Sequence, residues 1–235
     1  MGTQNWWESA KIYELYVDKF ARDFKGLTAR LDYFNHLGIN ALQVLPHYPS
    51  PMIDDGYDIS DYRNVRPALG TLGDFSAFVA AAHAQGINVI VDLVANHVSS
   101  THPWFLEARS SRENAKRDWF IWSETGREFE NAPNPFIDFK PSNWIWNEMT
   151  RDYYYATFYP EQPDLNWDNP RVLEDMLATI DFWVDQCVDG FRLDAVPFLV
   201  ERDYTKSQGL PETHRIVRAI HGHLQTRHKG SVMLL

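Results

Sequence analysis

The sequence predicts an α/β fold in which apolar strands alternate with amphipathic helices. One unit occurs three times: a helix, a glycine, an apolar strand and then a cluster of polar residues. Strands that alternate with helices in this way form parallel βα units with right-handed crossovers. Polar residues at the carboxyl ends of the strands fit both a (β/α)8 barrel and an open doubly wound sheet. No GxGxxG or P-loop motif is present, which disfavours a nucleotide-binding open sheet.

Five strands are expected along the chain. One lies in KIYELYV, ahead of the first repeated unit. The three units then place strands in ALQVLP, INVIVDLV and GFRLDAV, and the last apolar run is SVMLL. Runs of this length between turn residues are typical of buried strands of a parallel sheet.

Each of the three predicted helices has an apolar stripe at helical spacing. The stripes are Leu27, Leu31, Phe34 and Leu37 in the first helix; Phe75, Phe78, Val79 and Ala82 in the second; and Leu173, Met176, Leu177, Ile180 and Val184 in the third. Gly38, Gly86 and Gly190 follow these helices and fit the left-handed position that ends a helix.

The spacing of the units predicts an insertion. Gly38 and Gly86 are 48 residues apart, whereas Gly86 and Gly190 are 104 apart. The extra residues are rich in Trp, Tyr, Pro and Asn, and a connection of that length needs a structure or a function of its own. We therefore expect an inserted subdomain at residues 98–166, between parts of the main domain at 1–97 and 167–235.

Composition excludes several classes of protein. The formal net charge of −10 argues against a nucleic-acid-binding surface and against docking on an anionic membrane. No signal peptide and no apolar run of roughly 18 residues is visible, so a cytoplasmic location is expected. The single cysteine, Cys187, excludes an intramolecular disulfide and is expected to be a small buried hydrophobic residue late in a helix. The sequence does not indicate an oligomeric state.

Charged residues within the predicted strands mark a candidate site. In GFRLDAV, Arg192 and Asp194 are two residues apart and therefore share one face of the strand. Burying both charges is costly unless they are paired or used. Polar residues follow two neighbouring strands as well, and all of them should converge on one rim: Asp54, Asp55, Tyr57, Asp58 and Asp61 in DDGYDISDY, and Asp92, Asn96 and His97 in VDLVANH.

Glycoside cleavage is the chemistry that fits this rim. It needs one carboxylate and one carboxylic acid on either side of the reacting carbon. Asp194 suits the ionised partner, because an adjacent arginine lowers the pKa of an aspartate by roughly 1–3 units. Each cluster alone also fits a structural interpretation, as an ion pair, a buried acid or a solvated turn. Three clusters at successive strand ends favour a functional one.

Three motifs resemble the α-amylase superfamily, glycoside hydrolase family 13: DLVANH, GFRLDAV and QPDLN. Within that family, LPHYPSPMIDDGYDISDY, FYPEQPDLNWDNP, AVPFLVERD and LPETH are most similar to trehalose synthase-like and α-glucosidase members. DYTKSQG stands where an EGTN-like run would follow VERD. The resemblance implies a (β/α)8 barrel, of which this chain supplies about the first five strands. It also implies a retaining enzyme that interconverts maltose and trehalose by glucosyl transfer through a covalent β-glucosyl-aspartate.

The resemblance implies a role for each matching residue. Asp194 would be the nucleophile, and Arg192 would orient it. Substrate would be bound by Asp54, Tyr57, Asp92, His97 and Gln162. Calcium, which takes hard oxygen ligands, would be bound by Asn96, Asp164 and Glu201. No organic cofactor is implied. The nine histidines are not expected to form a transition-metal site, because His221 and His223 diverge on a helix.

The family's general acid/base, a glutamate just after the fifth strand, is expected beyond Leu235, so the chain alone is expected to be inactive. Three alternatives remain open at this point. The first is an α-glucosidase, oligo-1,6-glucosidase or α-amylase that hydrolyses α-glucosidic bonds. The second is a non-catalytic amylase-like interaction protein, and the third is an unrelated barrel enzyme such as a lyase.

Overall fold

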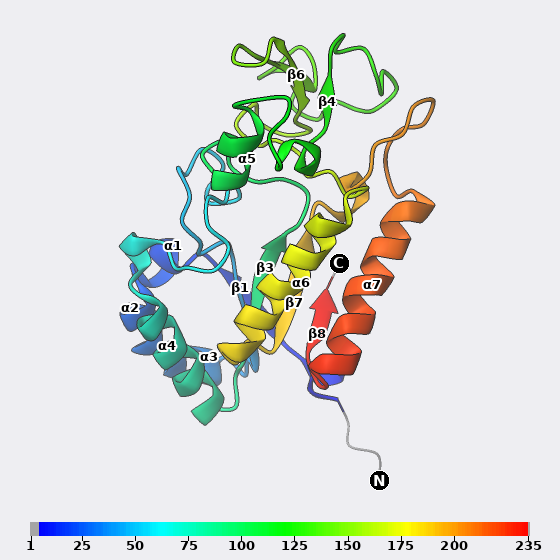
Figure 1. Cartoon of the computed structure of the whole chain (residues 1–235). Helices are drawn as coiled ribbons and strands as arrows, with labels where there is room; N and C mark the ends of the chain where they lie inside the picture. Colours follow the sequence, from blue (N-terminus) through cyan, green and yellow to red (C-terminus); the bar gives the residue numbers. More distant parts are fainter. Residues whose placement is uncertain (1–4, 235) are drawn as a thin grey trace.

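A parallel five-stranded sheet lies at the centre of the computed structural model, which describes residues 5–234 (Figure 1). Its strands follow the order β1 (Ile12–Leu15), β2 (Ala41–Val44), β3 (Asn88–Val94), β7 (Gly190–Asp194) and β8 (Val232–Leu234). A strand forms in each of the five predicted stretches; Leu235 lies outside the described residues. The predicted parallel α/β arrangement is therefore confirmed, and the closed barrel stays a prediction. Parallel pairing brings all five carboxyl ends to one edge of the sheet.

The connections between these strands are helical. The longer helices are α4 (Leu72–Ala84), α6 (Pro170–Asp185) and α7 (Pro211–Arg227); the shorter ones are α1 (Val17–Ala21), α2 (Phe24–Thr28), α3 (Leu31–His36) and α5 (Pro103–Ala108). Short 3-10 segments occur at η1 (Trp6–Ser9), η2 (Pro67–Leu69), η3 (Arg117–Trp119) and η4 (Val196–Phe198). Local sequence explains where the long helices begin. Thr71 and Asp74 form a capping box at α4, and Asn169 caps α6 ahead of Pro170.

The first predicted helix is two helices in the structure, α2 and α3. Leu27, Leu31 and Phe34 are buried as predicted, but Leu37 is 48% exposed, so its place in the stripe was wrong. The reason is that α3 ends at His36, which leaves Leu37 outside the helix.

The predicted role of Gly190 was also wrong. The left-handed residue after α6 is Cys187, with φ of 65°, and it is exposed rather than buried in the helix. Gly190 is the first residue of β7. A Cβ atom there would lie 2.6 Å from a methyl group of Val232, so β7 needs a glycine for close packing against β8. Gly38 and Gly86 do have φ values of 72° and 73°, as predicted.

A second, smaller sheet lies in the segment between β3 and α6. It is antiparallel, with the order β4 (Trp122–Ser123), β6 (Asp152–Tyr155) and β5 (Trp144–Asn147). Figure 1 shows this segment above the carboxyl ends of the central strands. Two isolated β-bridges add to the pairing of this segment. His97–Asp164 joins the segment to the end of β3, and Phe120–Leu165 joins two parts of the segment to each other. The boundaries 98–166 stay a prediction.

Aromatic side chains fill the core between the sheet and its helices. Trp183 of α6 is fully buried, and its Nε1 donates a hydrogen bond to the carbonyl of Tyr62 at 2.7 Å. Phe24 of α2 packs against Phe75 and Phe78 of α4. This packing holds the loop after β2 against α6 and so fixes one wall of the rim. Within residues 5–234, no helix combines the length and the apolar character that crossing a membrane requires.

Candidate active site

Arg192 lies at the centre of a polar network at the carboxyl edge of the sheet. Its Nη1 is 2.6 Å from Oδ1 of Asp194 on the same strand and 3.0 Å from Oδ2 of Asp92 on β3. Tyr57 donates its hydroxyl hydrogen to Oδ2 of Asp92 at 2.8 Å. The register of the sheet explains why Arg192 contacts Asp92, because these two residues are directly paired between β7 and β3. The predicted convergence of these four residues is therefore confirmed.

Asp92 is fully buried, and its other oxygen, Oδ1, accepts a hydrogen bond from Nε2 of Gln43 at 3.2 Å. Burial raises the pKa of Asp92 to about 6, although the charge of Arg192 and the hydroxyl of Tyr57 act in the opposite direction. Both oxygens of this carboxyl group are thus used by protein donors. Asp92 is therefore placed to hold Arg192 and Tyr57 rather than to attack a substrate.

The pKa of Asp194 differs from the one that the sequence predicted. Burial raises its pKa above the ordinary value, even though the charge and hydrogen bond of Arg192 and the backbone at Ala195 lower it. The prediction that Arg192 gives Asp194 a depressed pKa was wrong, because the cost of burying the carboxylate outweighs the adjacent charge. Arg192 still favours the ionised form relative to a site without it.

A cavity of about 220 Å³ opens at Asp194. Its lining consists of Asp54, Tyr57, His97, Phe136, Phe158 and Asp194. Phe136 and Phe158 come from the segment between β3 and α6 and were not predicted as site residues. Their signal in the sequence was weak, since aromatic residues are common throughout that segment and most serve packing. An apolar wall opposite a carboxylate suits a sugar ring, which has apolar faces and polar edges.

His97 is buried beside this cavity, with its ring 5.3 Å from that of Phe158 between centroids. Burial lowers its pKa to about 3, so the imidazole is neutral at physiological pH. Its Nε2 has no hydrogen-bond partner among the described residues. A buried ring nitrogen without a partner is available to a bound hydroxyl group.

The aspartates in the loop after β2, DDGYDISDY, make different contacts. Asp54 is hydrogen-bonded through Oδ2 to Nε2 of Gln162 at 2.9 Å and lines the cavity. Asp58 is buried and accepts hydrogen bonds from Ser50 and from the backbone of residues 53 and 54, so it shapes the loop. Asp55 instead pairs with Lys19 at the surface. Of the acids in this loop, only Asp54 lines the cavity.

Asn96, Asp164 and Glu201 are buried, as a calcium site would require. Oδ1 of Asn96 has no hydrogen-bond partner among the described residues. Burial raises the pKa of Asp164 and of Glu201, and the charge of Asp164 raises that of Glu201 further. Two buried carboxyl groups that repel each other, beside an unpaired amide oxygen, fit a hard cation with oxygen ligands.

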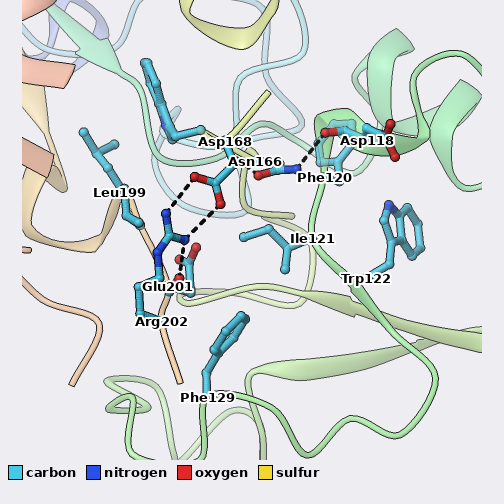
Figure 2. A pocket seen from close by; sticks show the side chains of 12 residues that line it. Asp118, Phe120, Ile121, Trp122, Phe129, Asn166, Asp168, Leu199, Glu201 and Arg202 are labelled. Carbon is cyan, nitrogen blue, oxygen red and sulfur yellow. Dashed lines mark hydrogen bonds and ion pairs between the residues drawn. The ribbon is translucent and has the colours of Figure 1, made fainter. Parts of the chain in front are cut away.

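A separate pocket of about 320 Å³ lies beside Glu201 (Figure 2). Arg202 and Asp168 meet there through two contacts, at 2.9 and 2.7 Å, which join the segment after β7 to the segment before α6. The pocket shares no lining residue with the cavity at Asp194. The two pockets are therefore separate, and the Arg202–Asp168 pair borders only the one beside Glu201.

Comparison with known proteins decides the family. The family described as "Alpha amylase, catalytic domain" matches residues 12–234. The chain belongs to this alpha-amylase family. It is 42% identical over 236 residues to a trehalose synthase of Pimelobacter sp. (strain R48), covering 97% of this chain and 41% of that protein. It is 44% identical over 202 residues to a probable alpha-glucosidase of Rhizobium meliloti (strain 1021), covering 83% of this chain and 37% of that protein.

A solved structure of the alpha-amylase family has the same arrangement. The trehalulose synthase MutB from Pseudomonas mesoacidophila MX-45 superposes with a TM-score of 0.87 at 36% identity, covering 98% of this chain and 45% of that one. The chain thus spans less than half the length of these relatives. The family resemblance that the sequence motifs indicated is confirmed.

Proposed function

We propose that the complete protein is a retaining enzyme that transfers or hydrolyses the terminal glucose of short α-glucosides, with Asp194 as its nucleophile. The observation that supports this most strongly is the placement of Asp194. Its carboxylate lines a small cavity, and Nη1 of Arg192 holds it at 2.6 Å. An oriented carboxylate against a sugar-sized cavity is the arrangement that covalent glycoside chemistry needs.

The reaction proceeds in two steps. Asp194 attacks the anomeric carbon, so a bond forms from its carboxylate oxygen to that carbon while the bond to the leaving oxygen breaks. The leaving oxygen takes a proton from a glutamic acid outside residues 1–235. In the second step that glutamate removes a proton from water or from a sugar hydroxyl, which attacks the anomeric carbon and frees Asp194.

The remaining rim residues bind the glucose unit. Tyr57 presents its ring to the cavity while Asp92 holds its hydroxyl, and neutral His97 offers Nε2 to a sugar hydroxyl. Gln162 donates a hydrogen bond to Asp54, which lines the cavity and would limit the length of sugar chain that it accepts. A cavity of about 220 Å³ has room for one sugar ring. The names of the relatives, trehalose synthase and alpha-glucosidase, agree with an α-glucoside as substrate.

Calcium belongs to the same proposal, with Asn96, Asp164 and Glu201 as its ligands. The ion would supply positive charge between two buried carboxylates and would join the end of β3 to the segments before α6 and after β7. Asn96 precedes His97 directly, so this link would hold one wall of the substrate cavity. No organic cofactor is part of the proposal.

Incubating the full-length protein with maltose tests the proposal. Trehalose as the main product supports glucosyl transfer, and free glucose alone supports hydrolysis. Asp194→Asn should abolish both, and Asp185→Asn, at an exposed position of α6, serves as the matched control. A slowly hydrolysed fluoroglucosyl substrate should leave a glycosyl mass on the peptide that contains Asp194. Maltose binding without turnover in the wild type would support the non-catalytic alternative instead.

A further inference from the structure

Two histidines and an aspartate meet between α6 and α7. Nε2 of His223 and Nε2 of His228 each lie 2.5 Å from Oδ1 of Asp181. All three side chains are largely covered, with 13%, 13% and 28% of their surfaces exposed, respectively. Within residues 5–234 this is the only group of three or more His, Cys, Asp or Glu side chains whose ligand atoms lie within 4.8 Å of one another.

The end of α7 explains why the two histidines meet. Positions five apart on a continuous helix are separated by about 140° around its axis and do not share a face. However, α7 ends at Arg227, and His228 has φ of −132° and ψ of 62°. The chain turns there, and the imidazole of His228 comes back to Asp181 of α6. The sequence spacing suggested only the pair His221 and His223. His221 is exposed on the same helix and does not belong to the cluster.

The cluster lies away from the substrate cavity. Asp181 is in the last turns of α6, which leads to the start of β7, and His228 is shortly before the start of β8 (Figure 1). These positions are near the amino ends of the strands, whereas Asp194 and the proposed calcium ligands are near the carboxyl ends. Neither the substrate nor the calcium proposal uses the cluster.

We propose that Asp181, His223 and His228 bind a divalent transition-metal ion of the zinc class, which links α6 to α7. Two imidazole nitrogens and one carboxylate oxygen are a common set of protein ligands for such ions, with water in the fourth position. The side chain of Asp181 is 28% exposed, so solvent water can reach the cluster. In a tetrahedral site the ligand atoms lie about 3.4 Å apart, so the rings need to withdraw from Asp181 by about 0.9 Å.

The direction of the two rings supports the same assignment. Nε2 of His223 and Nε2 of His228 lie beside the same carboxylate oxygen, and neutral imidazoles with a carboxylate are the forms that bind metal. A bound ion would replace the two hydrogen bonds to Oδ1 and fix the turn between α7 and β8.

The test uses the full-length protein, stripped with a chelator and kept in excess calcium so that the oxygen site is filled. Zinc chloride is titrated by calorimetry, and cobalt chloride is titrated by visible absorption. Wild type should bind one ion per chain and show the intense bands of tetrahedral cobalt. His223→Gln and His228→Gln should each weaken zinc binding at least about tenfold and remove those bands. His221→Gln is the matched control and should bind as wild type does.

The proposal is overturned if wild type shows no tetrahedral cobalt spectrum, or if both variants bind zinc as tightly as wild type. Circular dichroism of the metal-free variants checks their folding. If either glutamine variant is misfolded, Asp181→Asn takes its place, because it keeps the size of the side chain and the hydrogen-bonding capacity. Maltose turnover is measured in parallel. Loss of zinc binding with turnover retained separates this site from the proposed active site.

Discussion

Arg192 holds Asp194 across two residues of the same strand, with Nη1 2.6 Å from Oδ1. The same nitrogen is 3.0 Å from Asp92 on the neighbouring strand. One guanidinium therefore balances two largely buried carboxyl groups. Arg192 contacts Asp194 because side chains two residues apart on a strand share one face. It contacts Asp92 because the parallel register pairs these two residues directly.

Replacing Arg192 by alanine should reduce kcat of the full-length enzyme on maltose by at least about 100-fold, because Asp194 loses both orientation and its favourable charge. The pKa of Asp194 should rise further, so the acidic limb of the pH–rate profile should move to higher pH. Arg192→Lys should keep part of the charge effect and lose the fixed geometry. Arg63→Ala, which breaks a surface pair with Asp175, is the control. An unchanged acidic limb in Arg192→Ala would contradict this role.

Calcium should stabilise the full-length protein, and Glu201→Gln should remove that response. At a calcium concentration of 100 times Kd the gain is about 2.7 kcal/mol. Without calcium, the variant should be as stable as wild type or more so, because one of two mutually repelling buried carboxylates is gone. Thermal unfolding with and without calcium, with magnesium for comparison, measures both effects. Glu174→Gln, on the exposed side of α6, should respond as wild type does.

Stability below pH 6.5 should depend on His47. This ring is fully buried, stacks on Phe75 at 5.0 Å between centroids, and has no hydrogen-bond partner at either nitrogen among the described residues. Burial, and secondarily the charge of Arg66, lowers its pKa to about 3. The unfolded chain binds a proton below pH 6.5, whereas the folded chain does not until about pH 3. The free energy of unfolding should therefore fall as pH decreases, by up to about 1.4 kcal/mol per pH unit.

His47→Phe should remove that part of the slope and leave stability at pH 7 the same or higher, since no ring nitrogen is then buried without a partner. Urea unfolding at several pH values between 7 and 4.5 measures the slope. His36→Gln, at an exposed position of α3, should leave the slope unchanged. Equal slopes in wild type and His47→Phe would show that His47 takes up a proton while folded.

The sequence predicted the parts of the site that follow from strand geometry. Arg192, Asp194 and Asp92 lie on regular strands, where periodicity and parallel pairing define the facing side chains. Phe136 and Phe158 could not be assigned in this way, because they lie in a segment without regular periodicity and reach the cavity only through its tertiary fold. The raised pKa of Asp194 was missed for a related reason, since spacing gives the neighbouring charge but not the depth of burial.

The cluster of Asp181, His223 and His228 shows the same limit. Sequence spacing compares histidines along one ideal helix, whereas this cluster depends on the residue at which α7 ends and on the packing of α6 beside it. The predicted position of Leu37 failed at a helix end as well. Helix ends are where local propensity gives the least information, because tertiary contacts decide the last turn.

Asp54 and Asp55 offer a test of the substrate cavity with a built-in control. Asp54 lines the cavity and accepts a hydrogen bond from Gln162, whereas the neighbouring Asp55 pairs with Lys19 at the surface. A hydrogen bond from a sugar hydroxyl to a carboxylate contributes about 1.5–3 kcal/mol. Asp54→Ala should therefore lower kcat/KM for maltose in the full-length enzyme by about 10- to 150-fold, and Asp55→Ala should change it less than about twofold. Because Asp54 also limits the cavity, the loss should be smaller for maltotriose than for maltose. An equal loss for both substrates would mean that Asp54 binds the glucose unit without setting the length of chain that the cavity accepts.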